Sequence, residues 1–465
     1  MAMRRVLILA GAVADGAGMA ARPGAVVIEV DETMTRTLGG RVRLIATGAR
    51  REIEREFGGA GGGGRGGEPT GDIQRIVMED ALVMPALVNA HTHLDLTNIG
   101  PIAHDASRGF EGFARAVMER RPKDAAGISA AIAAGARLSR AGGVAAVGDI
   151  VGFVGGAWRA RDVEESQRSG HADHEYAALS GVSFQEFFSM GARGAERLES
   201  LLGEGFLQAF AAVNGMETGL SPHAPYSVDG GALAAAGVVA AARRMRLMVH
   251  VAESMQERAA MLRGEGPLVQ MLRSMGLLDE RAEAWISAGG SSMARVAQAL
   301  GAEACALTAA VHCNDVSAAD IDLLRSFAGV VYCPRSSAYF GHDVEFGPHR
   351  YRDMMARGVT VALGTDSIMN LPREEADRLS TWDEMRWLRR RDGVDGVTLL
   401  RMATVNGARV LGMDDGLFTF GAGGGAREIG GVIAVRGELR GSSSGEWIER
   451  ALESRVSPEA VALSS

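Results

Sequence analysis

Short apolar runs alternate with longer alanine-rich stretches between residues 84 and 411, and this alternation constrains the fold more than any other feature. The apolar runs have the length of strands and the alanine-rich stretches that of helices, so each pair is typical of one βα unit. The expected strands are Ala86–Ala90, Val144–Asp149, Val182–Phe188, Met216–Ser221, Leu247–Ala252, Leu307–Cys313, Val330–Cys333 and Val359–Thr365. Eight such units are the content of a closed parallel barrel. We therefore predict an α/β chain with a (β/α)8 TIM barrel over residues 84–411.

Both ends of the chain differ from this central region. Residues 1–83 contain short β-type runs, and the glycine-rich segment 58–67 predicts a flexible loop between two of them. These runs are Val6–Ala10, Ala25–Val30, Arg41–Ile45 and Ile73–Val77. Residues 412–465 return to such runs, for example Gly431–Arg436, and end in a polar tail. We expect the two ends to combine in one small β-sandwich domain that is discontinuous in sequence.

Composition argues against several kinds of partner. The formal net charge is −8, so the chain lacks the basic field that nucleic-acid binding usually needs. No stretch approaches the ~20 apolar residues of a membrane-spanning helix. The apolar run Val6–Ala14 follows two arginines like a secretory signal, but Asp15 interrupts the approach to any cleavage site. Three cysteines without a CxxC pair favour a reducing compartment, so we expect a cytoplasmic protein that binds neither nucleic acid nor membrane.

The strongest sign of chemistry is the histidine pair His91 and His93, at the end of the first predicted barrel strand. Residues i and i+2 of a strand point to the same side, so both imidazoles face one region. Imidazole binds zinc and iron, and barrel enzymes collect their catalytic groups where the strands end. An isolated HxH pair also occurs as an ordinary polar strand end, so the metal interpretation depends on the other strands.

Further ionisable side chains lie at the ends of the other predicted strands. They are His223 after the fourth strand, His250 and Glu253 at the fifth, His312 at the sixth and Asp366 at the eighth. A closed barrel brings these strand ends together. Among the remaining histidines, we expect His342 to line a pocket and the other four to be solvated, namely His104, His171, His174 and His349.

These groups predict a hydrolytic site with one metal ion. Three neutral imidazoles and a carboxylate can hold one divalent ion and leave a position for water, whose pKa the ion lowers. The expected ligands are His91, His93, His250 and Asp366. The expected catalytic groups are Glu253 as proton carrier, His312 to orient the water or stabilise the adduct, and Asp366. Taken singly, Glu253 is equally well explained as a solvated carboxylate at a helix start, and His312 as a core histidine.

With these motifs, residues 84–411 resemble the amidohydrolase superfamily, in its cytosine deaminase and chlorohydrolase-like (ATZ/TRZ) branch. The resemblance implies one Zn or Fe ion per subunit, with zinc expected first, and the same ligands and proton-transfer pair as above. It also implies that His223 contacts substrate. Binuclear members bridge two metals with a carboxylated lysine on strand 4, whereas Lys123, the sole lysine of this chain, lies between strands 1 and 2. We therefore expect one ion.

Two segments bear on the substrate. His93–Thr97, followed by Gly109–Phe113, is similar to a pattern of aminodeoxyfutalosine deaminases, although Asp95 stands where those enzymes often carry glutamate. Cys333–His342 is similar to the substrate-facing segment of the branch, which implies substrate contacts from Arg335 and Ser336. The Arg335 fork suits a carboxylate or phosphate, and a surface ion pair is the alternative for it.

The resemblance thus predicts a metal-dependent hydrolase that deaminates a small amino-substituted N-heterocycle or nucleoside, with an aminodeoxyfutalosine-like compound as the expected substrate. It also implies a homodimer. The alternatives are hydrolysis of another C–N or C–Cl bond, by a cyclic amidase or chlorohydrolase, and a catalytically silent barrel with a binding role. Glu253 favours ammonia release, because a poor amine leaving group needs protonation whereas chloride does not.

Overall fold

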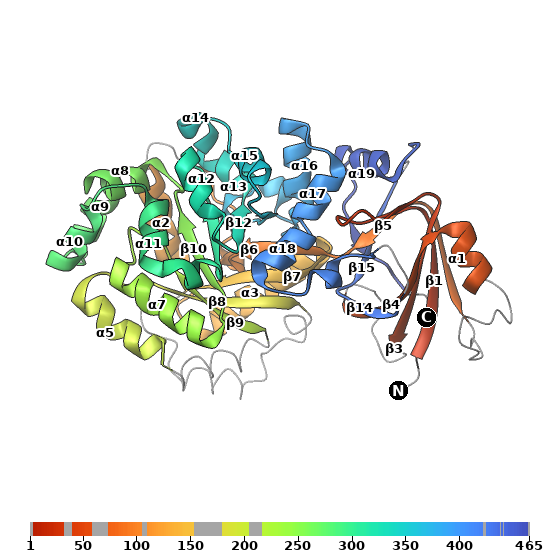
Figure 1. Cartoon of the computed structure of the whole chain (residues 1–465), viewed down its shortest axis with the longest axis horizontal. Coiled ribbons are helices and arrows are strands. Elements are labelled where there is room, and N and C mark those ends of the chain that lie inside the picture. The colour runs from red at the N-terminus through yellow and green to blue at the C-terminus, as the bar shows by residue number, and fades with distance from the viewer. Residues whose placement is uncertain are drawn as a thin grey trace.

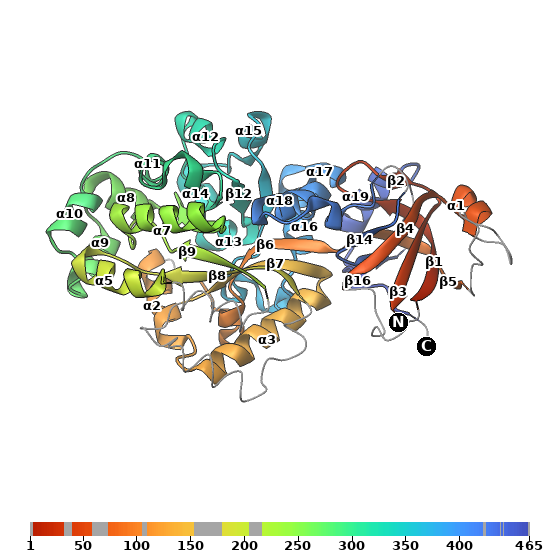
Figure 2. The same cartoon turned by 60° about the horizontal axis from the view of Figure 1, so that its bottom comes forward.

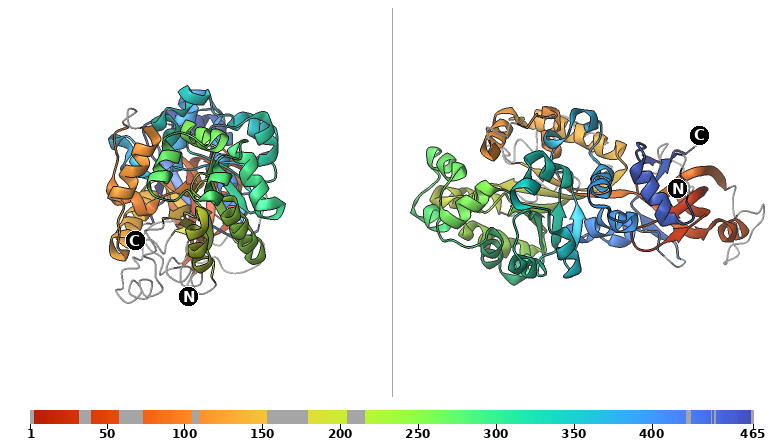
Figure 3. Two further views of the ribbon diagram at one scale, coloured as in Figure 1. Left: turned by 90° about the vertical axis from the view of Figure 1, so that its left-hand side faces the viewer. Right: turned by 90° about the horizontal axis from the view of Figure 1, so that it is seen from above.

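Two eight-stranded sheets organise the computed structural model. The structure describes residues 3–31, 40–57, 73–104, 109–152, 179–203, 216–421, 425–437, 439 and 441–463. One sheet forms the barrel, and the other lies at one end of the elongated molecule with both chain termini beside it (Figures 1 and 3). The glycine-rich segment 58–67 lies outside the described residues.

The first sheet is the predicted barrel. Its strand order is β13-β12-β11-β10-β9-β8-β7-β6, and neighbouring strands pair in parallel. The strands are β6 (Leu87–Thr92), β7 (Val144–Val151), β8 (Ser180–Phe187), β9 (Glu217–Pro222), β10 (Leu247–Val251), β11 (Thr308–His312), β12 (Gly329–Tyr332) and β13 (Val361–Leu363). Each overlaps one expected run, so the prediction of the barrel is confirmed. The runs are almost continuously apolar because strands of a closed parallel barrel are buried on both faces.

The barrel closes where its first and last strands meet, and we call this junction the seam. An isolated parallel bridge joins Thr92 to Asp366. The His93 N–H donates to the Asp366 carbonyl over 3.0 Å, and the N–H groups of Thr365 and Asp366 donate to the His91 carbonyl over 3.0 and 3.1 Å. The seam therefore places His91, His93 and Asp366 side by side.

Helices surround the barrel on the outside (Figure 2). Those between β6 and β11 are α2 (Gly109–Arg120), α3 (Ala125–Ala141), α5 (Gly191–Leu201), α7 (Gly230–Arg243), α8 (Met255–Arg263), α9 (Pro267–Ser274), α10 (Glu280–Ile286) and α11 (Ser292–Cys305). Those after β11 are α12 (Ala318–Leu324), α13 (Pro334–Phe340), α14 (His342–Phe346), α15 (Tyr351–Ala356), α16 (Thr381–Asp392), α17 (Gly396–Met402) and α18 (Val405–Leu411). Short 3₁₀ turns are η1 (Leu94–Ile99), η4 (Ile368–Asn370), η5 (Arg373–Glu375) and η6 (Asp415–Phe418). No helix in the described part of the chain is long and apolar enough to cross a membrane.

The second sheet combines strands from both ends of the chain, as expected. Its order is β14-β4-β3-β1-β5-β15-β16, with β2 paired to β1, so all eight strands lie in one curled sheet. The strands are β1 (Met3–Ala14), β2 (Ala20–Ala21), β3 (Gly24–Asp31), β4 (Val42–Ala49), β5 (Gln74–Pro85), β14 (Arg427–Ile429), β15 (Val432–Arg436) and β16 (Glu459–Ala460). Along β1, Val6 and Ile8 belong to one core cluster and Leu7 and Leu9 to another, as the two-residue period of a strand requires. The domain boundaries at 83/84 and 411/412 stay a prediction.

Two helices of these terminal regions were not foreseen. Helix α1 (Arg50–Phe57) covers one face of the second sheet through Ile53. Helix α19 (Ser444–Glu453) lies in the region where we expected only β-type runs and a polar tail. Ser443 caps α19 by accepting from the Glu446 N–H. Of its buried residues, Trp447 packs against Gly11 of β1 and Ile448 against Gly396 of α17.

Candidate metal centre and active site

Four side chains converge at the mouth of the barrel. His91 lies near the end of β6, His93 directly follows this strand, His250 lies in β10 and Asp366 follows β13. One nitrogen from each histidine lies within 4.8 Å of the others. An Asp366 carboxylate oxygen lies 3.7 Å from His91 Nε2 and 3.6 Å from His93 Nε2. Nitrogen and carboxylate donors at such mutual distances can surround one divalent ion.

The nitrogen atoms of this cluster are available to bind a metal ion. His250 Nδ1 donates to the His223 carbonyl over 2.8 Å, which places the proton on Nδ1 and leaves Nε2 as a free electron-pair donor. His91 Nε2 is buried and has no hydrogen-bond partner in the described chain. Burial lowers the pKa of both His91 and His93, so their imidazoles are neutral. The residues therefore fit a metal ion.

Glu253 and His312 lie next to this cluster. The Glu253 carboxyl is 3.4 Å from His312 Nε2, and both side chains are buried. Burial, together with the charges of Asp366 and Glu257, raises the pKa of Glu253 well above its ordinary value. A carboxyl with a raised pKa can hold a proton near neutral pH and pass it on, which is what a general acid and base must do.

The backbone at these strand ends is held in unusual conformations. Ala252, His312, Cys313 and Asp366 have φ values of 54, 71, 52 and 57°, in the left-handed region that side chains with a Cβ rarely adopt. The Glu257 carboxylate accepts from the N–H groups of Ala252 and Glu253 over 2.8 and 3.0 Å. Burial raises the pKa of Glu257 to about 7. Strained backbone of this kind is typical of functional sites, where the surrounding contacts hold it in place.

The three residues that we expected to contact substrate lie in different surroundings. His223 follows β9, with its ring 5.2 Å from that of His250 and 4.4 Å from that of Phe188, so it lies beside the centre. Ser336 donates instead to Asp366 Oδ2 over 2.6 Å, which makes it a support of a candidate metal ligand. Asn370 donates to the same oxygen over 3.2 Å.

Arg335 directs two nitrogens of its fork to carboxylates of the chain itself, and its expected contact with substrate stays a prediction. Its Nε donates to Glu384 over 2.6 Å and its Nη1 to Glu375 over 2.9 Å. Its side chain is only 2% exposed, so this is a buried ion pair and not the surface pair that was the alternative. The partners lie 49 and 40 residues away in sequence, which no local pattern reveals.

His349 was expected to be solvated, and this was wrong. Its ring is buried and stacks on Tyr332 with ring centroids 3.8 Å apart. Nε2 donates to the His312 carbonyl over 2.8 Å, and Nδ1 accepts from the Tyr351 N–H over 3.0 Å. His342 is also buried, its Nδ1 bonded to Glu345 over 3.2 Å. His104 is exposed, and His171 and His174 lie outside the described residues.

A second group of donors, formed by Glu186, His223 and His250, lies beside the first. The guanidinium of Arg121 is 3.5 Å from the Glu186 carboxylate and 2.8 Å from that of Asp95. A fixed positive charge at this distance opposes a second cation on Glu186. The Glu186 and Arg121 pair thus favours a site for one metal ion.

The closed barrel, with three histidines and an aspartate at its strand ends, defines the class of metal-dependent barrel hydrolases. Residues 82–423 match the amidohydrolase family, and the chain belongs to this family.

Relatives with known names are deaminases. An aminodeoxyfutalosine deaminase of Deinococcus radiodurans is 30% identical over 403 residues, covering 85% of this chain and 83% of the relative. A 5-methylthioadenosine/S-adenosylhomocysteine deaminase of Syntrophus aciditrophicus is 26% identical over 408 residues, covering 84% and 79%.

Solved structures show the same fold. An aminofutalosine deaminase of Helicobacter pylori in complex with methylthio-coformycin has a TM-score of 0.67 at 17% identity, covering 97% of both chains. A triazine hydrolase variant has a TM-score of 0.63 at 15% identity, covering 94% of this chain and 88% of the other.

Proposed function

We propose that this protein is a metal-dependent aminohydrolase that deaminates an amino-substituted N-heterocycle or nucleoside. The observation that carries the proposal is the protonatable Glu253 carboxyl beside His312, next to the convergent set of His91, His93, His250 and Asp366. An aminodeoxyfutalosine-like nucleoside is the first candidate substrate, because the Deinococcus radiodurans relative of that name matches most of both chains.

His91, His93, His250 and Asp366 would hold one divalent ion, with zinc as the first candidate and iron as the second. A Xanthomonas campestris adenosine deaminase of similar fold was solved with bound zinc, at a TM-score of 0.58 and 19% identity. When bound, such an ion supplies a Lewis acid that makes a water molecule acidic near neutral pH. Ser336 and Asn370 hold the Asp366 carboxylate in place for this role.

Glu253 moves the protons of the reaction. It takes one proton from the attacking water and delivers it to the ring nitrogen. It then carries the second proton, from the hydroxyl of the adduct, to the amine, so that the C–N bond breaks as the C=O bond forms and ammonia leaves as a neutral molecule. His312 Nε2 faces the same carboxyl and orients the oxygen that attacks. Burial keeps the pKa of His312 well below its ordinary value, so its imidazole is neutral in this role.

His223 contacts the substrate through a defined tautomer. Ser227 donates its hydroxyl to the Ala224 carbonyl, so the same oxygen accepts from His223 Nδ1 over 2.6 Å. The proton is then on Nδ1, and Nε2 is left to accept from an N–H or O–H of the substrate.

The test combines metal analysis of the purified protein with ammonia release across adenine nucleosides, guanine, cytosine, S-adenosylhomocysteine and a chlorotriazine. About one ion per chain and ammonia release from a nucleoside are expected. The proposal of a metal-dependent enzyme would be refuted by less than about a tenth of an ion per chain together with ammonia release that added Zn²⁺ or Fe²⁺ does not stimulate. Chloride release without ammonia release would establish the chlorohydrolase alternative.

Replacing Glu253 by glutamine tests the proton carrier. E253Q keeps the shape but cannot exchange the proton, so kcat should fall by about 10²–10⁴-fold while the metal content stays unchanged. The matched control is E265Q, whose side chain is 61% exposed, and it should behave like the unmodified protein. Full deamination by E253Q would exclude the proposed role.

Compartment and assembly are also proposals. Cys305, Cys313 and Cys333 are free and buried, which supports a reducing compartment such as the cytoplasm. A homodimer is the assembly that we propose, and sedimentation of the purified protein measures it.

A further inference from the structure

The main chain turns sharply between the end of β10 and the start of helix α8. Ala252 in this turn has a φ of 54°, in the left-handed region. Successive N–H groups of such a turn can converge on one anion, which they do not do in an extended strand. The N–H groups of Ala252 and Glu253 both donate to the Glu257 carboxylate, over 2.8 and 3.0 Å. Glu257 therefore holds the main chain on which the proposed proton carrier stands.

Ordinary helix capping does not explain this position of the Glu257 carboxylate. Ser254 is the residue before α8, and its hydroxyl oxygen accepts from the Glu257 N–H over 3.2 Å. In a capping box, the glutamate would return a bond to the N–H of this same serine. The carboxylate instead reaches one and two residues further back along the chain. It thus acts on the turn after β10 and not on the end of the helix.

Glu257 is fully buried, and a buried carboxylate is costly unless its oxygens accept hydrogen bonds. Both oxygens accept from main chain, and the side chain of Ser292 in α11 adds a further hydrogen bond. An apolar side chain would fill the same space without that cost. The contribution of the carboxylate therefore lies in the two N–H groups that it orients.

The carbonyl of Glu253 is held as well. Asn314 Nδ2 donates to it over 3.0 Å, and the hydroxyl of Ser337 in α13 donates to Asn314 Oδ1 over 2.6 Å. A carbonyl only accepts, so the amide nitrogen of Asn314 must face it. Ser336, the neighbour of Ser337, donates to Asp366. Helix α13 thus supports the proton carrier and a candidate metal ligand at once.

Hydrogen bonds at both its N–H and its carbonyl fix the direction in which the Glu253 side chain leaves the main chain. Its carboxyl lies 3.4 Å from His312 Nε2. Proton transfer needs heavy atoms about 2.6–3.2 Å apart, or one water between them. A misplacement of about 1 Å can lower a rate about 100-fold. The position of this carboxyl is therefore a sensitive quantity.

We propose that Glu257 and Asn314 are positioning residues: they hold the main chain of Glu253 at its two ends and so fix its carboxyl relative to His312. The assignment rests on the proposed function, because proton transfer by Glu253 is what the position serves. The charge of Glu257 also raises the pKa of Glu253. Asn314 carries no charge, so variants of the two residues separate the effect of position from that of charge.

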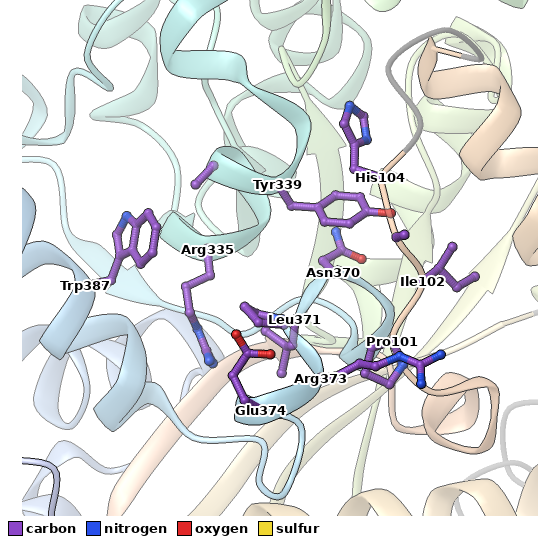
Figure 4. Close-up of a pocket in the computed structure, with 13 residues that line it drawn as sticks. Pro101, Ile102, His104, Arg335, Tyr339, Asn370, Leu371, Arg373, Glu374 and Trp387 are labelled. Atoms are coloured by element: carbon purple, nitrogen blue, oxygen red, sulfur yellow. The ribbon is translucent and has the colours of Figure 1, made fainter.

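A cavity of about 490 Å³ lies against α13, the helix that supports Asn314 (Figure 4). Arg335 and Tyr339 of this helix line it, whereas neither Glu257 nor Asn314 does. Changes at Glu257 and Asn314 therefore leave the walls of the cavity intact, and their effects belong to the turn after β10.

Steady-state kinetics of the metal-loaded, full-length protein, with the nucleoside of the panel that it deaminates, test the proposal. Glu257→Gln keeps the volume, but its amide nitrogen then faces an N–H group. We expect kcat to fall about 10–100-fold, with KM and metal content changed less than about twofold. Glu257→Asp keeps the charge and should recover part of kcat. Asn314→Ala changes no charge and should lower kcat about tenfold.

Ala260→Gly is the matched control, because it loosens the middle of α8 and leaves the turn untouched. It should lower the melting temperature and leave kcat unchanged. The proposal would be overturned by a folded Glu257→Gln variant with the kcat of the unmodified protein. A fall in kcat that Ala260→Gly reproduces at an equal melting temperature would show a merely structural role. If Glu257→Gln does not fold, Glu257→Asp and Asn314→Ala provide the same comparison.

A crystal structure of Glu257→Gln gives a readout that does not depend on turnover. The Glu253 carboxyl should move away from His312 Nε2, and an unchanged carboxyl position would contradict the proposal. If the unmodified protein deaminates nothing in the panel, the proposed function fails. The displacement of the Glu253 carboxyl still shows whether Glu257 holds the turn.

Discussion

His349 takes no direct part in the proposed chemistry, yet it holds the backbone of a residue that does. Both of its ring nitrogens bond to main chain, and one of these bonds ends on the carbonyl of His312, whose φ is 71°. The imidazole of His312 faces Glu253, so a shift in the position of this carbonyl would also move the His312 side chain relative to Glu253.

Replacing His349 by phenylalanine tests this support. His349→Phe keeps the stack on Tyr332 but leaves a buried carbonyl and a buried N–H without partners, each worth about 1–3 kcal/mol. We expect lower stability and a fall in kcat that exceeds any rise in KM. His349→Gln restores a donor near the Nε2 position and should recover part of kcat, whereas His104→Phe, at an exposed histidine, should change neither quantity.

His349 also makes the free energy of unfolding depend on pH. Burial lowers the pKa of His349 to about 4, from its ordinary 6.5. A depressed pKa means that the unfolded chain binds the proton more tightly, so the stabilising effect is complete above pH 6.5 and is lost as the pH falls toward 4. The free energy of unfolding should fall by about 3 kcal/mol over this pH range. Denaturation of the unmodified protein and of His349→Gln between pH 4 and 7 measures this loss. Parallel plots of the free energy of unfolding against pH for the two proteins would contradict the prediction.

Much of the site was predictable at the scale of the residue because chemistry and strand position coincide. His91, His250, His312 and Asp366 each lie at or just beyond a buried strand, and a barrel gathers such ends whatever its loops do. Partners in the second layer were not predictable. Glu384 pairs with Arg335 across 49 residues, and only the folded chain shows this pairing.

At the scale of the element, the barrel strands were predictable and two terminal helices were not. Strands that are buried on both faces appear as continuous apolar runs, which are easy to find in a sequence. Helix α1 is RREIEREF, with Ile53 as its only fully buried residue, so its sequence has almost no apolar pattern. Helix α19 follows a serine-rich stretch and spans only ten residues, which hid its buried face.

Trp447 is the residue through which α19 can be tested. It is 5% exposed, and its ring lies so close to Gly11 of β1 that a Cβ there would meet it at 2.3 Å. Trp447→Ala should lower the free energy of unfolding by about 3–5 kcal/mol, because the cavity cannot collapse fully. Arg450→Ala, at an exposed position of the same helix, should stay within about 0.5 kcal/mol. Equal melting temperatures for both variants would show that α19 contributes little.

At the scale of the whole molecule, the candidate metal ligands join the two ends of the barrel sheet. His91 lies in the first strand, His93 directly follows it, and Asp366 follows the last strand. Few backbone hydrogen bonds connect these two strands directly. An ion bound by all three would therefore strengthen the seam.

Removal of the metal should loosen the seam before the rest of the barrel. We expect a chelator to lower the melting temperature and to speed hydrogen exchange at the amides of His93, Thr365 and Asp366. Amides in the ladder between β8 and β9 serve as the internal control and should exchange at nearly unchanged rates. Uniform acceleration across all strands would contradict a local effect at the seam.

The residues with a left-handed backbone conformation at the strand ends limit how stable this protein can become. Ala252, His312, Cys313 and Asp366 each hold a conformation that costs about 1–2 kcal/mol relative to ordinary backbone. Glycine would remove that cost, but at His312 and Asp366 it would also remove the side chain for which the conformation exists. A search for thermostable variants should accept glycine at Ala252 and reject it at those two positions. The side chains at His312 and Asp366 therefore come with a cost in stability that glycine would avoid.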